Sequence, residues 1–238
     1  MPSPSLTDVQ DGKRLFQDGK RPAIEPSAVA SRGEGTRLRW LSLTTDTETL
    51  ARLHAFLSDD ERERAARFHF ARDRDRFVAG RGQLRETLGA LLKVPPAAVE
   101  FAYGPQGKPA LAHETDLRFN LSHSQDWALL AMTVGCEVGV DLEFMRPDLN
   151  PLEVAPSVFS PEECAVLENL PESERLAAFY GYWTRKEAFI KALGLGFARD
   201  TREFTVNLEP EQVVEDSTIL SLDAPPGFLA AIATRPVE

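Results

Sequence analysis

The sequence predicts an α+β protein made of two similar halves. Its 238 residues, 42% of them hydrophobic, are enough to bury a substantial core. Patterns typical of strands and helices come in blocks instead of alternating strictly, and this order occurs roughly twice along the chain. The repetition divides the chain near residues 134–137.

In the first half, residues 1–36 are rich in Pro, Ser, Gly and charge, so we expect a loosely packed arm. The alternation in residues 37–43 predicts a strand, and residues 47–56 predict a helix. Ser58 and Glu61 form a capping box that opens the next helix. A long helix is expected over 73–92, with core-facing side chains at Phe77, Leu84, Leu88 and Leu91.

Short strands follow that helix at 99–103, 117–121, 127–133 and 138–143, with a tight turn at Gly135. We expect residues 147–156 to be a connection. Ser160 and Pro161 open a helix, because proline is favoured at the first helical position. A second helix is predicted over 172–193, ending at Gly194 and Gly196. The remaining residues, 201–233, predict three short strands.

Composition excludes several classes of protein. The net charge of −10 argues against general nucleic-acid binding. The longest apolar run, residues 127–134, is too short to span a bilayer, and the N-terminus has no apolar signal core. Cys136 and Cys164 lie far apart without metal-ligand spacing. We therefore expect a cytoplasmic protein with no membrane segment, disulfide framework or zinc site.

Residues 59–85 are dense in arginine, with eight Arg against six acidic residues in an otherwise acidic chain. This segment could hold a small polyanion. The alternative is a solvated helix face with ion pairs between residues three or four apart, and the charges alone favour this alternative.

Two acidic residues lie close together in the predicted strand 138–143. Asp141 and Glu143 alternate with Val140 and Leu142, so the carboxylates share one face and the apolar side chains point into the core. Adjacent carboxylates repel each other unless a cation or basic groups hold them, and carboxylate oxygens suit Mg²⁺. A polar sheet face in solvent is the alternative.

Trp183, Glu187 and Lys191 are spaced four residues apart and form one stripe on the predicted helix 172–193. An ordinary surface ion pair would explain this stripe. A carboxylate and an ammonium aimed into a cleft would serve as proton acceptor and as phosphate contact or proton donor.

Two further segments carry polar groups. The strand end Phe119–Ser124 offers Asn120, Ser122 and His123, although a structural histidine is the alternative. No acid is placed to orient a Ser–His pair, so a hydrolase triad is disfavoured. The Gly-rich turn at 104–107 brings Lys108 to its tip, but it lacks the ending of a P-loop.

Together these motifs resemble the Sfp-type 4′-phosphopantetheinyl transferases. The resemblance rests on GKPAL (107–111), FNLSHS (119–124), VGVDLE (138–143), WTRKEAFIKALGLG (183–196) and the arginine-rich segment. It implies a pseudo-twofold fold, with a small, mostly antiparallel sheet on a long helix in each half. We expect an N-terminal half at 37–136, which contributes to coenzyme A binding, and a C-terminal half at 137–238 with the metal and catalytic residues. The implied reaction is Mg²⁺-dependent transfer of phosphopantetheine from coenzyme A to a carrier-protein serine, releasing adenosine 3′,5′-bisphosphate.

The resemblance also implies roles for individual residues. It assigns metal binding to Asp141, Glu143 and Glu187. Glu187 is also the candidate base, and Lys191 the phosphate contact and acid. Coenzyme A binding falls to residues of several segments, namely Arg64, Arg76, Lys108, Asn120, Ser122, His123, Lys186 and Lys191.

One position departs from the family pattern, because Glu61 stands where some members have a second basic residue. This leaves Arg64 with more of the 3′-phosphate contact, or assigns that contact to a neighbouring residue. The two-half length implies a broad-specificity monomer acting on acyl or peptidyl carrier proteins of fatty-acid, polyketide or nonribosomal-peptide synthesis. A non-catalytic protein that binds coenzyme A or a carrier, and a metal-dependent phosphoesterase, are the alternatives.

Overall fold

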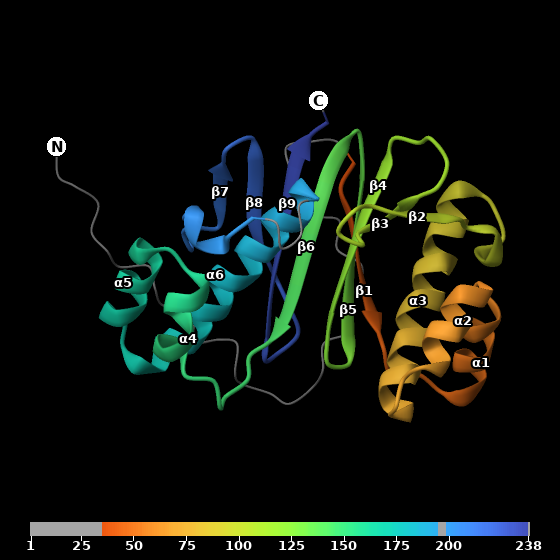
Figure 1. Ribbon diagram of the computed structural model, residues 1–238, viewed down its shortest axis with the longest axis horizontal. Coiled ribbons are helices and arrows are strands. Elements are labelled where there is room, and N and C mark those ends of the chain that lie inside the picture. Colours follow the sequence, from red (N-terminus) through yellow and green to blue (C-terminus); the bar gives the residue numbers. More distant parts are fainter. Residues whose placement is uncertain (1–34, 195–198, 238) are drawn as a thin grey trace.

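The computed structural model describes residues 35–194 and 199–237, which form two units of sheet and helix (Figure 1). The predicted arm over 1–36 therefore lies, except for residues 35 and 36, outside the described residues. The first unit contains β1 (Arg37–Ser42), α1 (Thr47–Ala55), α2 (Asp59–Ala66), α3 (Ala71–Leu92), β2 (Phe101–Tyr103), β3 (Pro109–Leu111), β4 (Leu117–Ser124) and β5 (Trp127–Val134). The second contains β6 (Cys136–Phe144), α4 (Pro151–Val158), α5 (Pro161–Asn169), α6 (Glu172–Leu193), β7 (Glu211–Val214), β8 (Ser217–Leu222) and β9 (Phe228–Pro236).

Each unit has its own antiparallel sheet. The first sheet has the strand order β1-β5-β4, and the second has the order β6-β9-β8-β7. Strands β2 and β3 form a separate short hairpin. The chain passes from the first sheet to the second at Gly135, whose φ of 72° favours glycine. The predicted α+β class is confirmed.

The core of the first unit lies between α3 and its sheet, where Leu41, Leu84, Leu88 and Leu130 are at most 1% exposed. Gly82 lies inside α3 although glycine disfavours helix, because a Cβ there would come within 2.6 Å of the Leu53 Cβ atom on α1. The close approach of α1 therefore explains the glycine.

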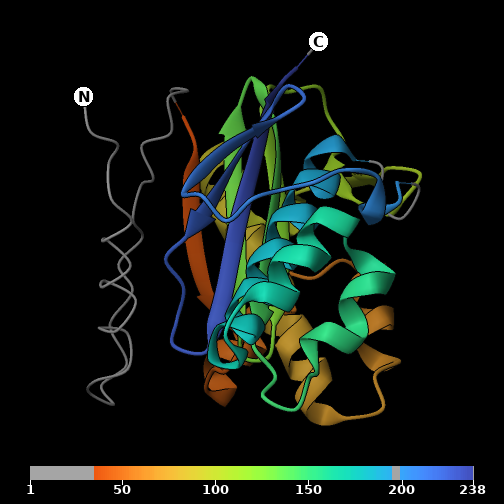
Figure 2. The ribbon, with the colours of Figure 1, turned by 90° about the vertical axis from the view of Figure 1, so that its left-hand side faces the viewer.

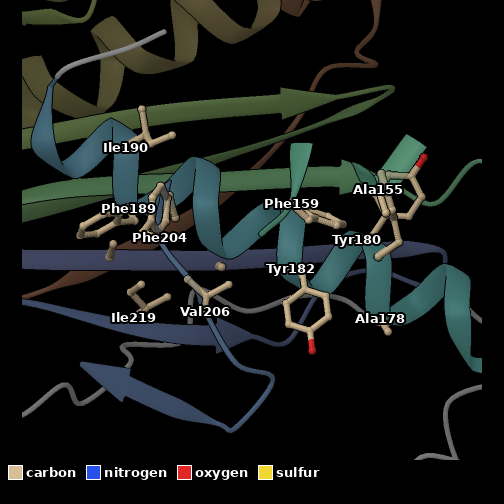
Figure 3. Close-up of a cluster of buried hydrophobic side chains, with 14 of the residues drawn as sticks. Ala155, Phe159, Ala178, Tyr180, Tyr182, Phe189, Ile190, Phe204, Val206 and Ile219 are labelled. Carbon is tan, nitrogen blue, oxygen red and sulfur yellow. The ribbon is translucent and has the colours of Figure 1, made fainter. Parts of the chain in front are cut away.

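The core of the second unit joins α6 to β8 and β9. Figure 3 shows its aromatic side chains, with the Phe189 and Phe204 ring centroids 4.9 Å apart. Phe159 packs against Phe179 of α6 at the same centroid distance, which ties the segment between α4 and α5 to the long helix. Figure 2 shows α4, α5 and α6 together on one side of these strands.

The structure corrects four details of the sequence prediction. The expected connection 147–156 contains most of α4, a helix with Pro156 inside it and Ala155 buried against the core. Strand β3 was not predicted, and Leu91 is 36% exposed instead of core-facing. The three C-terminal strands begin only at residue 211, because residues 201–203 form a 3₁₀ turn.

None of the helices in the described part of the chain combines the length and apolar character that a membrane crossing demands.

Candidate functional site

A glycine brings β6, which carries Asp141 and Glu143, and helix α6 together. A Cβ at Gly139 of β6 would lie 2.0 Å from the Ala188 carbonyl oxygen and 2.3 Å from the Ala192 nitrogen. Only glycine therefore lets α6 rest directly on β6. As a result, Glu187 and Lys191 of α6 lie beside Asp141 of β6.

Asp141 is the most buried of the acidic groups here, at 2% exposure. Its Oδ1 accepts hydrogen bonds from Lys191 Nζ at 2.5 Å and from Ser122 Oγ at 3.0 Å. Its Oδ2 is buried and has no hydrogen-bond partner among the described residues. A buried carboxylate oxygen without a partner is costly, so this atom is available to a cation or a ligand donor.

The two glutamates are partly buried and hold their protons more readily than free carboxyls. Burial raises the pKa of Glu143 to about 7, and the charge of Asp141 adds to this, while hydrogen bonds from Trp183 and Ser124 act in the opposite direction. Burial also raises the pKa of Glu187, which the nearby Lys191 ammonium counteracts. Glu143 can therefore exchange protons near neutral pH, and Glu187 binds a proton more readily than a free glutamate.

Three cavities run from α6 to α2. The first, about 280 Å³, is lined by Glu187 and Lys191 and by the tip of the β2–β3 hairpin. The second, about 500 Å³, is lined by Arg64, Arg76 and His123. The third, about 360 Å³, lies between α2 and the hairpin. Leu121 lines both the first and the second cavity, so the acidic groups and the basic groups border neighbouring spaces.

The basic residues of the second cavity are held in different ways. The Arg64 guanidinium lies 5.1 Å from the centre of the Phe77 ring, whereas Arg76 donates to Asp126 at 2.7 Å. His123 lines this cavity and is exposed, yet the protein around its ring displaces enough water to lower its pKa, and Lys191, Arg64 and Arg76 add to the effect. The imidazole therefore favours its neutral form more strongly than a free histidine does.

Lys108 borders the first cavity, but its ammonium is engaged by the protein. It donates to the Lys191 carbonyl at 2.8 Å and the Val138 carbonyl at 3.0 Å, and it pairs with Glu137 at 3.4 Å. Burial lowers its pKa. Lys108 thus joins the hairpin of the first unit to the end of α6 and the start of β6.

The structure does not bring Lys186 into the cluster. Its side chain is fully buried on the other side of α6, where the ammonium pairs with Glu163 at 2.8 Å and donates to the Thr201 carbonyl at 2.7 Å and to the Phe204 carbonyl. It lines none of the three cavities described above. The expected contact with coenzyme A therefore does not fit this conformation.

Glu61, the departure from the family pattern, has a structural explanation. It is 2% exposed, accepts from Arg85 Nε at 2.6 Å and pairs with Arg81. It also completes the capping box of α2 by accepting from the Ser58 backbone. This acid fixes α2 on α3 and leaves Arg64 as the basic residue of α2 that lines the second and third cavities.

The sequence left three features of the site unpredicted. Arg81 lies 4.0 Å from the centre of the Phe101 ring and lines the second and third cavities, but nothing distinguished it within the arginine-rich segment. Trp183 was recognised in the stripe, but not as a hydrogen-bond donor to Glu143. Ser124 donates to Glu143 at 3.3 Å, and its alternation with Ser122 was a usable signal.

The carboxylate oxygens of this site are the type of ligand that a hard divalent cation prefers. Within residues 35–194 and 199–237, no three His, Cys, Asp or Glu side chains converge closely enough to hold a metal ion by themselves. The unpartnered Asp141 Oδ2 and the neighbouring Glu143 provide two carboxylates, and Mg²⁺ is usually bound by one or two carboxylates together with substrate phosphate oxygens. The residues therefore fit a metal that binds together with a phosphate ligand.

Comparison with known proteins identifies the family of the chain. Residues 137–224 match the family described as "4′-phosphopantetheinyl transferase superfamily", and residues 41–135 match "4′-phosphopantetheinyl transferase, N-terminal". Together the two matches cover most of the described residues.

Three relatives illustrate the similarity. The chain is 41% identical over 189 residues to the 4′-phosphopantetheinyl transferase HetI of Nostoc sp., covering 76% of this chain and 79% of the relative. It is 34% identical over 211 residues to a phosphopantetheinyl transferase of Thraustochytrium sp. (83% and 70%). It is 30% identical over 176 residues to a 4′-phosphopantetheinyl transferase of Bacillus subtilis (74% and 75%). The chain belongs to the 4′-phosphopantetheinyl transferase superfamily.

Proposed function

We propose that this enzyme transfers the 4′-phosphopantetheine group of coenzyme A to a serine hydroxyl of an apo carrier protein. Family membership supports the reaction. One observation supports the site: the Lys191 ammonium donates to Asp141, and Lys191 and Glu187 both line the first cavity. Attack by a neutral hydroxyl requires a base, and a departing phosphate requires positive charge or a proton.

In this proposal the serine oxygen attacks the phosphorus that carries the pantetheine arm, and Glu187 accepts the serine proton. The bond from this phosphorus to the bridging oxygen breaks, and adenosine 3′,5′-bisphosphate leaves. Lys191 offsets the charge on the leaving oxygen and can supply its proton. The raised pKa of Glu187 makes its carboxylate a stronger base than that of a free glutamate.

Asp141 and Glu143 would hold Mg²⁺, with Glu187 beside them, and the phosphates of coenzyme A would complete its ligands. The metal would offset the negative charge of the pyrophosphate when bound. Arg64, Arg76 and His123 line the adjoining cavity and are suited to a further phosphate group of the same ligand. On β4, Asn120 lines the first cavity, and the Ser122 hydroxyl is hydrogen-bonded to Asp141 and Lys191.

The carrier protein is the expected partner, and we propose that one chain provides a complete site, because both units contribute to the neighbouring cavities. Cys136 and Cys164 are free thiols, which supports the proposal of a reducing, cytoplasmic setting.

The test is mass spectrometry of an apo carrier protein incubated with coenzyme A, Mg²⁺ and enzyme. We expect the wild-type enzyme to add one phosphopantetheine and Glu187→Gln to lose at least 100-fold in rate, the lower range for removing a general base. Glu86→Gln serves as control, because Glu86 pairs with Arg52 outside the cavities. Full activity of Glu187→Gln would remove this residue from the mechanism.

The same experiment separates the alternatives. Release of phosphate or of the bisphosphate without a carrier would indicate a phosphoesterase. Binding of coenzyme A by calorimetry without turnover on a panel of carriers would indicate a binding protein that kept the fold.

A further inference from the structure

The two sheets meet at β4 and β6 through side chains instead of a backbone ladder. These strands belong to separate sheets, yet three polar side chains of β4 accept hydrogen bonds from backbone N–H groups of β6. Asn120 Oδ1 accepts from Val140 at 2.8 Å, Ser122 Oγ from Leu142 at 3.3 Å and Ser124 Oγ from Phe144 at 3.0 Å. The spacing of two residues on both strands makes this a regular three-step contact.

Two of these three β4 side chains also form a hydrogen bond to an acidic side chain of β6. Ser122 Oγ donates to Asp141 Oδ1 at 3.0 Å, and Ser124 Oγ donates to Glu143 Oε2 at 3.3 Å. In each case, the serine accepts from one backbone N–H of β6 and donates to the carboxylate of the preceding residue. The third step, at Asn120, faces Gly139, which has no side chain to receive a bond.

We propose that Ser122 and Ser124 are positioning residues that orient the carboxylates of Asp141 and Glu143 toward a divalent cation. This inference rests on the proposed function. A hydroxyl has one proton, and the backbone N–H of β6 occupies an acceptor site of its oxygen, so the proton is left for the carboxylate. The first unit thereby fixes two acids that belong to the second unit.

Of the two serines, Ser124 is the better one to test. Ser122 also accepts from Lys191 Nζ at 3.2 Å, so its removal would disturb the catalytic lysine as well. Ser124 contacts Glu143 and the Phe144 backbone, and Trp183 also donates a hydrogen bond to Glu143. Loss of the Ser124 hydroxyl would leave Glu143 free to turn away from Asp141, whose charge repels it.

The experiment compares Ser124→Ala, Ser124→Thr and wild type by Mn²⁺ binding, measured by electron paramagnetic resonance with saturating coenzyme A and no carrier protein. We expect Ser124→Ala to weaken Mn²⁺ binding about tenfold, the effect typical of residues that orient metal ligands, and Ser124→Thr to restore it. In the transfer reaction, Ser124→Ala should raise the Mg²⁺ concentration for half-maximal rate, with the KM for coenzyme A nearly unchanged at saturating Mg²⁺.

Thr133→Val is the matched control, because this buried hydroxyl of β5 donates to the Cys136 carbonyl at 2.6 Å and lines none of the three cavities. It should lower stability without changing Mn²⁺ affinity. Wild-type Mn²⁺ affinity in Ser124→Ala would overturn the positioning role. Absence of transfer by the wild-type protein would instead overturn the proposed function, so the two failures are distinguishable.

Discussion

Lys186 and Glu163 form an ion pair in which both side chains are almost wholly enclosed, at 0% and 1% exposure, with Nζ 2.8 Å from Oε2. Lys186 also binds the Thr201 and Phe204 carbonyls, so one ammonium joins α5, α6 and the segment that leads to β7. Glu163 in turn accepts from the backbone of Val206 at 2.8 Å. The pair therefore holds the second unit together.

We expect Lys186→Met to lower the free energy of unfolding by about 3–5 kcal/mol, because it leaves a buried carboxylate unpaired. Chemical denaturation measures this. Arg62→Met is the control, since the exposed Arg62–Asp59 pair should contribute less than about 1 kcal/mol. Wild-type stability together with a raised KM for coenzyme A would contradict the structural role and support direct ligand contact by Lys186.

Gly139→Ala tests the contact between β6 and α6. The added methyl group would collide with helix backbone atoms, which cannot move aside as a side chain can. We expect a loss of about 1–3 kcal/mol or more in stability, together with a large fall in transfer rate as Lys191 moves away from Asp141. Gly104→Ala is the control, because the nearest atom to its Cβ is 3.8 Å away. Equal melting temperatures for the two variants would disprove the close contact.

His123 should make the free protein sensitive to acid. Its pKa in the folded state lies below the ordinary value of 6.5, so between these two values the unfolded chain binds more protons. This contribution to stability is present above pH 6.5 and is lost as the pH falls toward the folded-state pKa. Proton NMR titration of the His123 ring checks the shift, with His113→Gln as the assignment control.

Binding of adenosine 3′,5′-bisphosphate should raise the pKa of His123, because a phosphate near the ring favours the imidazolium. A ring that titrates identically with and without this ligand would place the phosphate elsewhere.

Arg64→Ala should raise the KM for coenzyme A about tenfold or more, the typical loss of one charge-assisted hydrogen bond, with a smaller effect on kcat. Comparing coenzyme A with coenzyme A that lacks its 3′-phosphate shows whether Arg64 contacts that phosphate. If Arg64 binds that phosphate, the variant should lose most of the preference for intact coenzyme A. Arg74→Ala, which breaks an exposed pair with Asp75, is the control. An unchanged preference would assign the 3′-phosphate to another residue.

Local patterns predicted the elements that carry the site. Alternation along 138–143 correctly indicated buried Val140 and Leu142, both 0% exposed, and the four-residue spacing on α6 correctly placed Glu187 and Lys191 on one stripe. The predicted bounds 172–193 of that helix are confirmed, because Gly194 ends it in the left-handed conformation. Strong periodicity and a glycine cap need no information from distant parts of the chain.

The surroundings of Lys186 and Lys108 could not be predicted in this way. Lys186 is one residue from Glu187, about 100° around the helix, and its partner Glu163 lies on another helix. Lys108 meets carbonyl groups 30 and 83 residues away. Pairings across elements depend on how the elements pack, and a motif resemblance assigns a role to a residue without revealing its contacts.

The crossing at Gly135 gives the contact between β4 and β6 a further consequence. If the chain were cut there, Asp141, Glu143 and Glu187 would all lie on the C-terminal fragment. The N-terminal fragment would hold the hydroxyls of Ser122 and Ser124 and the Lys108 ammonium, which binds the last turn of α6. Neither fragment alone would contain all residues of the proposed active site. Catalytic competence would then be a property of the reassembled pair, so transfer activity from two separately produced fragments would report directly on whether the halves recognise each other.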